Sequence, residues 1–382
     1  MNFFSAFKGA FKSELKEIKN SYYKLFLLTL FPLVSFIAVI SIFYGGVLRE
    51  LPIVVVDQDR STISRKLLTN IENSPTMKIA YRVDSTKEAI SLIKSAKAYA
   101  FISIPSHFQR DVMLKKQPQV TAMLNTQYIL IGKVLTSALN STVMQSAGEV
   151  EYVKNLAIYT LPSLSKSALS PIGLQVTPFF NTYQNYFLFL VSALLPSLLQ
   201  IFVVVGTLVA FGTLFKERRE EALFRGGFVE MKILGTLTPY TLSYFLLGAL
   251  SLLYIYGFLG WEFQGSFALM LLGLFLMVVA YQAVALTLFV VGFNYARSLS
   301  LGALYTAPAF AFLGVTFPVQ SMNSFSQTYR EMLPIAHYME LEISQANYGL
   351  SPALEVDKLL SLLSFWILFV VVFYIFKKRV SL

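Results

Sequence analysis

The chain has no cysteine and only two histidines, His107 and His337, among its 382 residues. The lack of cysteine excludes disulfides, thiol catalysis and zinc sites built on cysteine. His107 has no acidic or nucleophilic partner nearby in the sequence, so we expect a structural role for it. Two isolated histidines do not indicate a metal cluster. We therefore expect no metal or cofactor in this chain.

Charge is also scarce. Charged residues make up 14% of the chain and hydrophobic residues 55%, whereas a soluble protein has about 25% charged residues. This deficit is typical of surfaces that face lipid, because a charge in hydrocarbon is costly. The net charge is +10, but no basic patch accompanies a nucleic-acid-binding fold, so we expect no nucleic-acid partner.

Six uncharged stretches are long enough to cross a bilayer, which takes about 20 residues. The sequence therefore predicts an α-helical integral membrane protein with six transmembrane helices. A re-entrant hairpin is the alternative for the third and fourth stretches. The six stretches are Leu25–Leu48, about Asn185–Phe215, Ile233–Trp261, Phe263–Ala296, Ser298–Tyr329 with its span ending near Phe317, and Leu359–Phe376.

Lysine and arginine residues in short loops predict the orientation, because such loops are retained in the cytoplasm. They cluster before the first span, between the second and third, at Arg297, and after the sixth. Both termini are then cytoplasmic. The predicted organisation is an interfacial helix at 1–24, a span at 25–48, an extracytoplasmic domain at 49–177, four spans within 178–317 with a cytoplasmic loop at 216–232, an extracytoplasmic segment at 318–357, and a last span with a basic tail at 358–382.

The N-terminal stretch is amphipathic. Apolar residues recur at helical spacing and lysines occupy the other face. We expect a separate helix in the cytoplasmic interface; a plain extension of the first span is the alternative. The apolar positions are Phe4, Phe7, Phe11, Leu15, Ile18 and Tyr22.

The segment between the first two spans alternates strand and helix patterns, which predicts an inserted α/β domain with a partly parallel sheet. Expected strands are Pro52–Val56, Met77–Val83, Ala98–Ile104 and Gln119–Asn125, and expected helices are Ser61–Asn70, Ser85–Lys97 and Leu130–Ala157. Asp57 and Asp59 precede the first of these helices, so capping is expected of them. In the later segment we expect one short amphipathic helix on the outer surface, Thr328–Ser344.

The chain shows no energy source of its own. A P-loop needs G-x-x-x-x-G-K-[S/T]. At Gly132-Lys133, Gln127 stands in place of the first glycine and Val134 in place of the final serine or threonine. The spans hold no charged residue that would couple transport to an ion. The spans contain uncharged polar residues, which either join helices by hydrogen bonds or line a substrate path. These residues are Asn185, Gln200, Tyr240, Tyr281, Gln282 and Tyr305.

Mixed charge follows the second span directly. The residues are Lys216, Glu217, Arg218, Arg219, Glu220, Glu221 and Arg225. This pattern is that of a solvated helical face, and it is equally what a membrane subunit needs to fit a groove on a cytoplasmic motor.

Several stretches resemble the membrane subunit of type-2 ABC exporters, the subgroup with a large extracytoplasmic domain after the first span. The stretches are Leu51–Ser61, Ile104–Asp111, Phe215–Glu221, Gly235–Tyr240, and Thr316–Pro318 with Leu333–Tyr338. The resemblance covers nearly the whole chain in order.

This resemblance implies a non-enzymatic permease in a bacterial inner membrane. ATP and Mg would bind a separate cytoplasmic ATPase subunit, which would drive the 216–227 loop and the N-terminal helix. A second permease, identical or paralogous, would complete the core, and a periplasmic adaptor protein assists export in some members. Substrates would be amphiphilic or drug-like. The alternative function is a non-transporting receptor or scaffold whose outer domain binds a ligand or partner.

Overall fold

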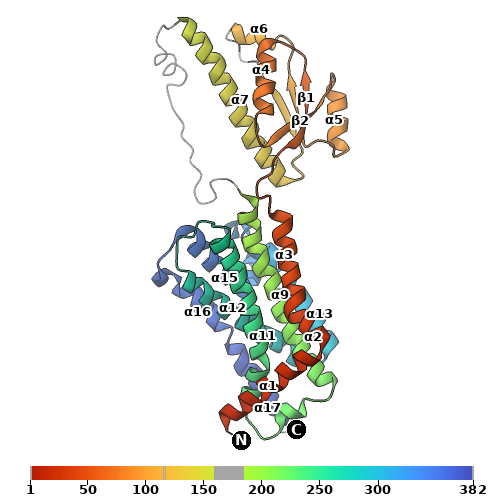
Figure 1. The fold of residues 1–382 in the computed structure, drawn as a ribbon, viewed down its shortest axis with the longest axis vertical. Coiled ribbons are helices and arrows are strands. Elements are labelled where there is room, and N and C mark those ends of the chain that lie inside the picture. Colours follow the sequence, from red (N-terminus) through yellow and green to blue (C-terminus); the bar gives the residue numbers. More distant parts are fainter. Residues whose placement is uncertain (1, 115, 117, 159–184, 381–382) are drawn as a thin grey trace. The chain divides into compact units, whose positions relative to one another are not determined.

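The computed structural model describes residues 2–114, 116, 118–158 and 185–380. The chain divides into two compact units. Unit 1 comprises Met1–Tyr44 and Phe179–Leu382, and unit 2 comprises Gly45–Pro178. Unit 1 is helical and unit 2 contains a sheet (Figure 1).

The sheet of unit 2 has four strands in the order β2-β1-β3-β4. β1 (Leu51–Asp57) pairs in parallel with β2 (Met77–Arg82) and β3 (Ala100–Ile104), and β3 pairs antiparallel with β4 (Thr121–Leu124). The continuous apolar run of β1 suits this central place, because both faces of a parallel strand are covered. The predicted partly parallel sheet is confirmed.

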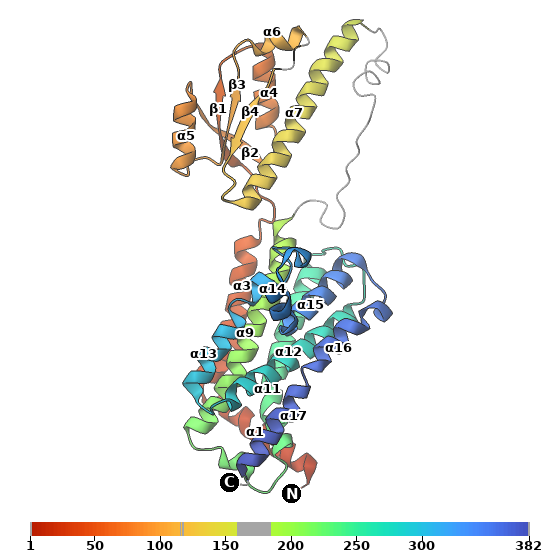
Figure 2. The same ribbon diagram turned by 180° about the vertical axis from the view of Figure 1, so that it is seen from behind.

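Helices cover both faces of this sheet (Figure 2). On one face, α4 (Thr62–Glu72) and α7 (Ile129–Ile158) pack over Ile53 and Val55. On the other face, α5 (Thr86–Lys94) packs over Val54 and Val56. The short helix α6 (Phe108–Met113) follows β3. Ser61 and Ser85 cap α4 and α5 through their side chains, as N-cap serines do.

Within the described residues, five helical stretches of unit 1 are long and apolar enough to cross a membrane. The third and fourth predicted spans are two separate helices, each long enough by itself to cross a membrane. The five are Tyr22–Phe43 (α2, Tyr22–Leu25; a π-helical turn; α3, Phe31–Phe43), α9 (Tyr186–Lys216), Val229–Phe258 (α11, Val229–Leu252, with a π-helical turn), α12 (Phe267–Val290), and Pro352–Lys378, which includes α16 (Val356–Ser364) and most of α17 (Ile367–Val380).

The predicted fifth span is not a continuous helix, so the count of six is not confirmed. α13 (Tyr295–Thr306) has 12 residues, about 18 Å at about 1.5 Å per residue, against a hydrocarbon core of about 30 Å. Pro308 follows it, and proline lacks the N–H that an α-helix needs. Two 3₁₀ turns, Ala309–Phe312 and Val319–Ser321, continue the chain.

The single surface helix predicted over Thr328–Ser344 is also wrong. Two helices occupy this region, α14 (Ser324–Glu331) and α15 (Pro334–Ile343), because Pro334 starts a new helix at its first position. α15 is buried rather than on the surface: Ile335, Tyr338 and Leu341 have no exposed area.

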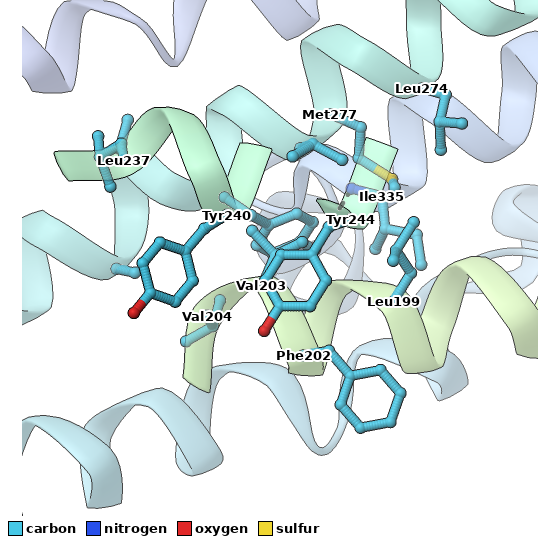
Figure 3. Close-up of a cluster of buried hydrophobic side chains, with 14 of the residues drawn as sticks. Leu199, Phe202, Val203, Val204, Leu237, Tyr240, Tyr244, Leu274, Met277 and Ile335 are labelled. Atoms are coloured by element: carbon cyan, nitrogen blue, oxygen red, sulfur yellow. Dashed lines mark hydrogen bonds between the residues drawn. The ribbon is translucent and has the colours of Figure 1, made fainter. Parts of the chain in front are cut away.

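α15 runs antiparallel to α12 inside unit 1. The backbone N–H of Ile335 donates to the Tyr281 hydroxyl (3.3 Å), and Gln345 beyond its other end accepts from the N–H of Ser266, just before α12. Tyr281 lies about 21 Å along α12 from Phe267, at about 1.5 Å per residue. The segment therefore re-enters the bundle, and Figure 3 shows Ile335 among side chains of α9, α11 and α12.

The N-terminal helix α1 (Phe3–Asn20) is separate from the first span, because Ser21 is extended and caps both α1 and α2. The predicted apolar stripe is only partly the packed face. Ile18 is buried, whereas Phe4 and Tyr22 are 68% and 92% exposed. Glu14 is buried instead, because its carboxylate contacts Lys24 of α2 and Tyr240 of α11.

Candidate functional site

The loop between α9 and α11 turns sharply around a single short helix, α10 (Glu221–Phe224). Arg218 has φ of 54°, and Gly226, Gly227 and Phe228 are consecutive left-handed residues. Only glycine adopts this conformation freely, so the Gly-Gly pair allows the return into α11. The predicted site residues Lys216, Glu217, Arg218, Glu221 and Arg225 are exposed on this loop.

Arg219 joins this loop to the N-terminal helix. Its guanidinium contacts the Glu17 carboxylate of α1 with both nitrogens (2.6 and 3.1 Å) and the Glu217 carboxylate at 2.7 Å. Partial burial disfavours the charged form, but these ion pairs outweigh it and raise the pKa of Arg219. A two-pronged arginine–carboxylate pair also fixes direction. The two sequence segments expected to receive the motor's motion therefore lie in contact.

Two lysines join α11 to its neighbours, one to the loop and one to α17. The ammonium of Lys232, buried on α11, donates to the carbonyls of Ala222 (3.1 Å), Leu223 (3.2 Å) and Arg225, and so caps the end of α10. Lys377 of α17 pairs with Glu230 of α11. Free carbonyls at a helix end attract cations, which explains the place of Lys232.

Phenylalanines pack behind the loop. Phe215 of α9 lies 5.0 Å from Phe289 and 6.1 Å from Phe376, measured between ring centroids, and Phe224 of α10 lies 6.3 Å from Phe376. Such pairs add about 0.5–1.5 kcal/mol each beyond their burial. The loop therefore packs, through Phe215 and Phe224, against the ends of α12 and α17.

α1 also crosses α11 closely, at Gly235. A Cβ there would lie 2.5 Å from the carbonyl oxygen of Phe7. One turn or more further along α11, the Tyr240 hydroxyl donates to the Glu14 carboxylate (2.9 Å), and Lys24 of α2 pairs with the same oxygen (2.8 Å). Glu14 and Lys24 are each only 4% exposed. This buried triad links α1, α2 and α11.

The six polar residues proposed for a substrate path all make hydrogen bonds within the chain. Asn185 caps α9, Gln200 donates to the Thr306 carbonyl (3.3 Å), and Tyr240 binds Glu14. Tyr281 accepts from Ile335 and Tyr305 donates to the Met332 carbonyl. Gln282 accepts from Thr241 (2.8 Å). Their role toward a substrate stays a prediction.

Unit 2 offers a second location. β1 and β2 end side by side at the carboxyl edge of the sheet, the edge at which ligands of α/β proteins bind, although the strand order reverses between β1 and β3. A pocket of about 310 Å³ lies there, lined by Arg60, Arg65 and Arg82 among others. Arg60 pairs with Asp84 (2.5 Å) and Arg82 with Glu72 (2.8 Å). Two of these three arginines thus have acidic partners, and Arg65 donates to the backbone carbonyl of Arg60 (3.1 Å).

The free N–H groups at the start of α4 are bound by another side chain of unit 2. The Gln109 side-chain oxygen accepts from the N–H groups of Thr62 (3.1 Å) and Ile63 (3.3 Å), which are the donors that an anion would use. The Gln109 N–H in turn donates to Asp59 (2.9 Å), while Asp57 accepts from Ser64 (2.9 Å). The prediction that these aspartates cap α4 is wrong: Ser61 caps α4, whereas Asp59 accepts from a backbone N–H at the start of α6 and Asp57 from the Ser64 hydroxyl.

This arrangement predicts acid sensitivity. Burial disfavours the charged form of Asp59, but hydrogen bonds from Ser61 and the Gln109 backbone outweigh it and lower the pKa of the carboxyl. Stability from Asp59 is therefore complete above the unfolded pKa of about 3.9 and is lost as pH falls through the lower folded value. We expect hydrogen exchange at 59–63 to accelerate on acidification. Asp59→Asn should show little of this dependence, and the exposed Asp84→Asn should behave as wild type; equal profiles for Asp59→Asn and wild type would contradict the assignment.

Sequence reasoning missed the anchoring residues. It treated the N-terminal helix as basic and apolar, although Glu14 and Glu17 stand in it one turn apart. Two carboxylates on an otherwise basic amphipathic helix are a signal that the helix has partners. Lys232 was counted only as a positive charge of the loop, whereas it is 5% exposed and bonded.

The family profile described as "ABC-2 family transporter protein" matches residues 24–376. Together with the apolar helices, this match confirms the resemblance, and the chain belongs to the ABC-2 transporter membrane family. It is a multi-pass membrane protein and the permease component of an ABC transporter. No curated protein and no solved structure matches it.

Permeases of this family normally lack an ATPase site and generally work with an ATPase partner.

Proposed function

We propose that this chain is the permease of an ATP-driven exporter, and that its ATPase subunit binds the α9–α11 loop. The observation that carries the proposal is the ion pair between Arg219 and Glu17. It joins an exposed, charged loop to a helix that itself crosses α11, so that a push on the loop moves α1 and α11 together.

The exposed charges suit docking on a protein partner. Glu217 and Arg218 stand at the end of α9 and Glu221 starts α10, all exposed. Charged residues at the rim of an interface direct association and register. ATP and Mg would be held by the partner. A positive-inside orientation would place this loop and both termini in the cytoplasm, and a second permease would complete the transport core.

An amphiphilic substrate fits a groove on unit 1. The groove has a volume of about 580 Å³ and lies between α3 and α11. Leu33, Ile37 and Leu250 form apolar walls, and Ser41 and Ser251 add hydroxyls. A hydrocarbon tail gains about 0.8 kcal/mol for each CH₂ that it buries. In a positive-inside orientation this groove lies at the outer ends of the two helices, where an exported amphiphile would leave, and export from the cytoplasm or the inner leaflet is part of the proposal.

The test is a charge reversal of the loop. We expect Glu217→Arg combined with Glu220→Arg to abolish co-purification of the ATPase and ATP-dependent movement of a fluorescent amphiphile in proteoliposomes. The reason is that like charges would then face the partner's groove, at a cost of several kcal/mol. Association is measured by affinity purification and flux by fluorescence.

A matched control is Glu72→Arg with Glu88→Arg, which reverses two exposed charges of unit 2. This variant should keep ATPase association. Retained binding and flux in the loop variant would refute the assigned docking loop. Retained binding without nucleotide-dependent flux in the wild type would instead favour a receptor or scaffold.

A further inference from the structure

A glutamate with no assigned role lies inside the helical bundle. Glu342 of α15 is 1% exposed, and within the described residues neither of its carboxylate oxygens has a hydrogen-bond partner. An ionised carboxylate in this state would lose its hydration without replacement, which is far more costly than burying a neutral carboxyl group. The burial therefore requires that Glu342 carry a proton.

The surroundings of Glu342 contain hydroxyls and no unpaired cation in the part of the chain described. The Tyr338 side chain, one turn earlier on α15, lies beside the Glu342 carboxyl group, and Tyr256, in the π-helical turn after α11, interacts with it electrostatically. The Tyr338 hydroxyl is itself buried without a hydrogen-bond partner. Phenol groups can accept from a protonated carboxyl or donate to an ionised one, so the cluster tolerates a change of protonation.

Arg330, His337 and Lys358, on α15 and on elements packed against it, have other partners. Arg330 of α14 pairs with Glu331 (3.1 Å) and with Glu340, and the His337 ring lies 3.0 Å from the Glu331 carbonyl. Beside α16, Lys358 pairs with Glu355 (2.7 Å). The remaining titratable groups on these elements are Tyr281 of α12, Tyr329 of α14, Asp357 of α16, Tyr348 after α15, and Tyr186 and Lys216 at the ends of α9.

The irregular flanks of α15 would allow this packed helix to move as a unit. It is joined to the bundle by the hydrogen bond from Ile335 to Tyr281 at one end and by Gln345 at the other. Its flanks are irregular, with Leu333-Pro334 before it and a π-helical turn ending at left-handed Gly349 after it. Ionisation of Glu342 would place an unpaired charge in this packed helix, so α15 would have to leave the bundle to hydrate it.

We propose that Glu342 is a proton-binding site, and that its protonated form holds α15 inside the bundle. Release of the proton to water at higher pH frees the segment, and uptake returns it. This inference is independent of the proposed function, because it requires neither a substrate nor the ATPase.

The first test is infrared spectroscopy of the full chain in nanodiscs. At about pH 7, where an ordinary glutamate is ionised, the wild type should show the carbonyl band of a protonated carboxylic acid. Glu342→Gln should lose this band. The matched control Glu340→Gln, which removes the Arg330-paired neighbour, should keep it. A wild type without the band, or a band that survives in Glu342→Gln, would overturn the site.

The second test follows the helix itself. Ala336 has no exposed area, and the chain has no cysteine, so Ala336→Cys gives a single buried thiol. We expect maleimide labelling to rise with pH more steeply in this variant than in Ala336→Cys with Glu342→Gln. Equal labelling of the two at every pH would refute the holding role. A Glu342→Gln chain that fails to fold would refute it also, since glutamine matches the protonated form in shape and charge.

Discussion

Replacing Glu14 with alanine should destabilise the chain by about 3–5 kcal/mol, the usual cost of removing one partner of a buried ion pair. The change leaves the Lys24 ammonium buried and the Tyr240 hydroxyl without its acceptor. The measurement is reversible denaturation of the purified chain in detergent micelles, followed by circular dichroism.

Two comparisons identify the cause. Glu72→Ala removes one partner of the exposed Arg82–Glu72 pair and should change stability by at most about 1 kcal/mol. Glu14→Met combined with Lys24→Met removes both buried charges and should recover most of the loss, because an apolar replacement of a buried pair is often neutral. The assigned burial would be wrong if Glu14→Ala were no worse than Glu72→Ala.

Gly235→Ala should release the N-terminal helix from α11. The added Cβ would lie 2.5 Å from the Phe7 carbonyl oxygen and 3.0 Å from the Ala10 Cβ. A backbone atom cannot rotate aside, so α1 must shift, and overpacking of this kind costs about 1–3 kcal/mol. We expect lower stability in denaturation and faster proteolysis at residues 3–20.

Gly9→Ala is the matched control, since it makes the same change on the other helix of the pair. A Cβ at Gly9 would meet nothing within 4 Å. Alanine there should stabilise α1 by about 0.5–1 kcal/mol through its better helix propensity. If both substitutions had the same sign, the close crossing at Gly235 would not be the reason.

Local patterns predicted the regular elements well. β1 was predicted within one residue at each end, because the short, β-branched apolar run Pro52–Val56 before Asp57 favours a strand covered on both faces. α9 was predicted to begin and end within one residue, since Asn185 caps it and Lys216 ends its apolar run. Apolar residues that recur every 2 or 3.6 positions can be recognised in the sequence without knowledge of tertiary contacts, which is why these elements were predictable.

Predictions failed where a segment's fate depends on distant partners. Residues 298–344 read as one span and one surface helix, because they are apolar and then amphipathic. Pro308 and Pro334 divide them, and the α12 surface then buries α15. Hydrophobicity does not distinguish a face that lipid covers from a face that another helix covers.

The candidate site shows the same division. The loop's charges were recognisable from Lys216 to Arg225, but the partner of Arg219 is Glu17, about two hundred residues earlier in the chain. An ion pair between residues so far apart in the chain produces no periodic pattern in the sequence, so it cannot be predicted from local spacing.

Composition and residue order determined that this chain crosses a membrane, that it has an α/β segment, and that it belongs with the ABC-2 permeases, because these properties depend on solvent preference and local geometry. Which charges are buried, and beside what, was decided only by the packing of α1 on α11 and of α15 on α12. The free energy of a buried carboxylate depends on the atoms within a few ångströms of it, and those atoms come from helices far away in sequence.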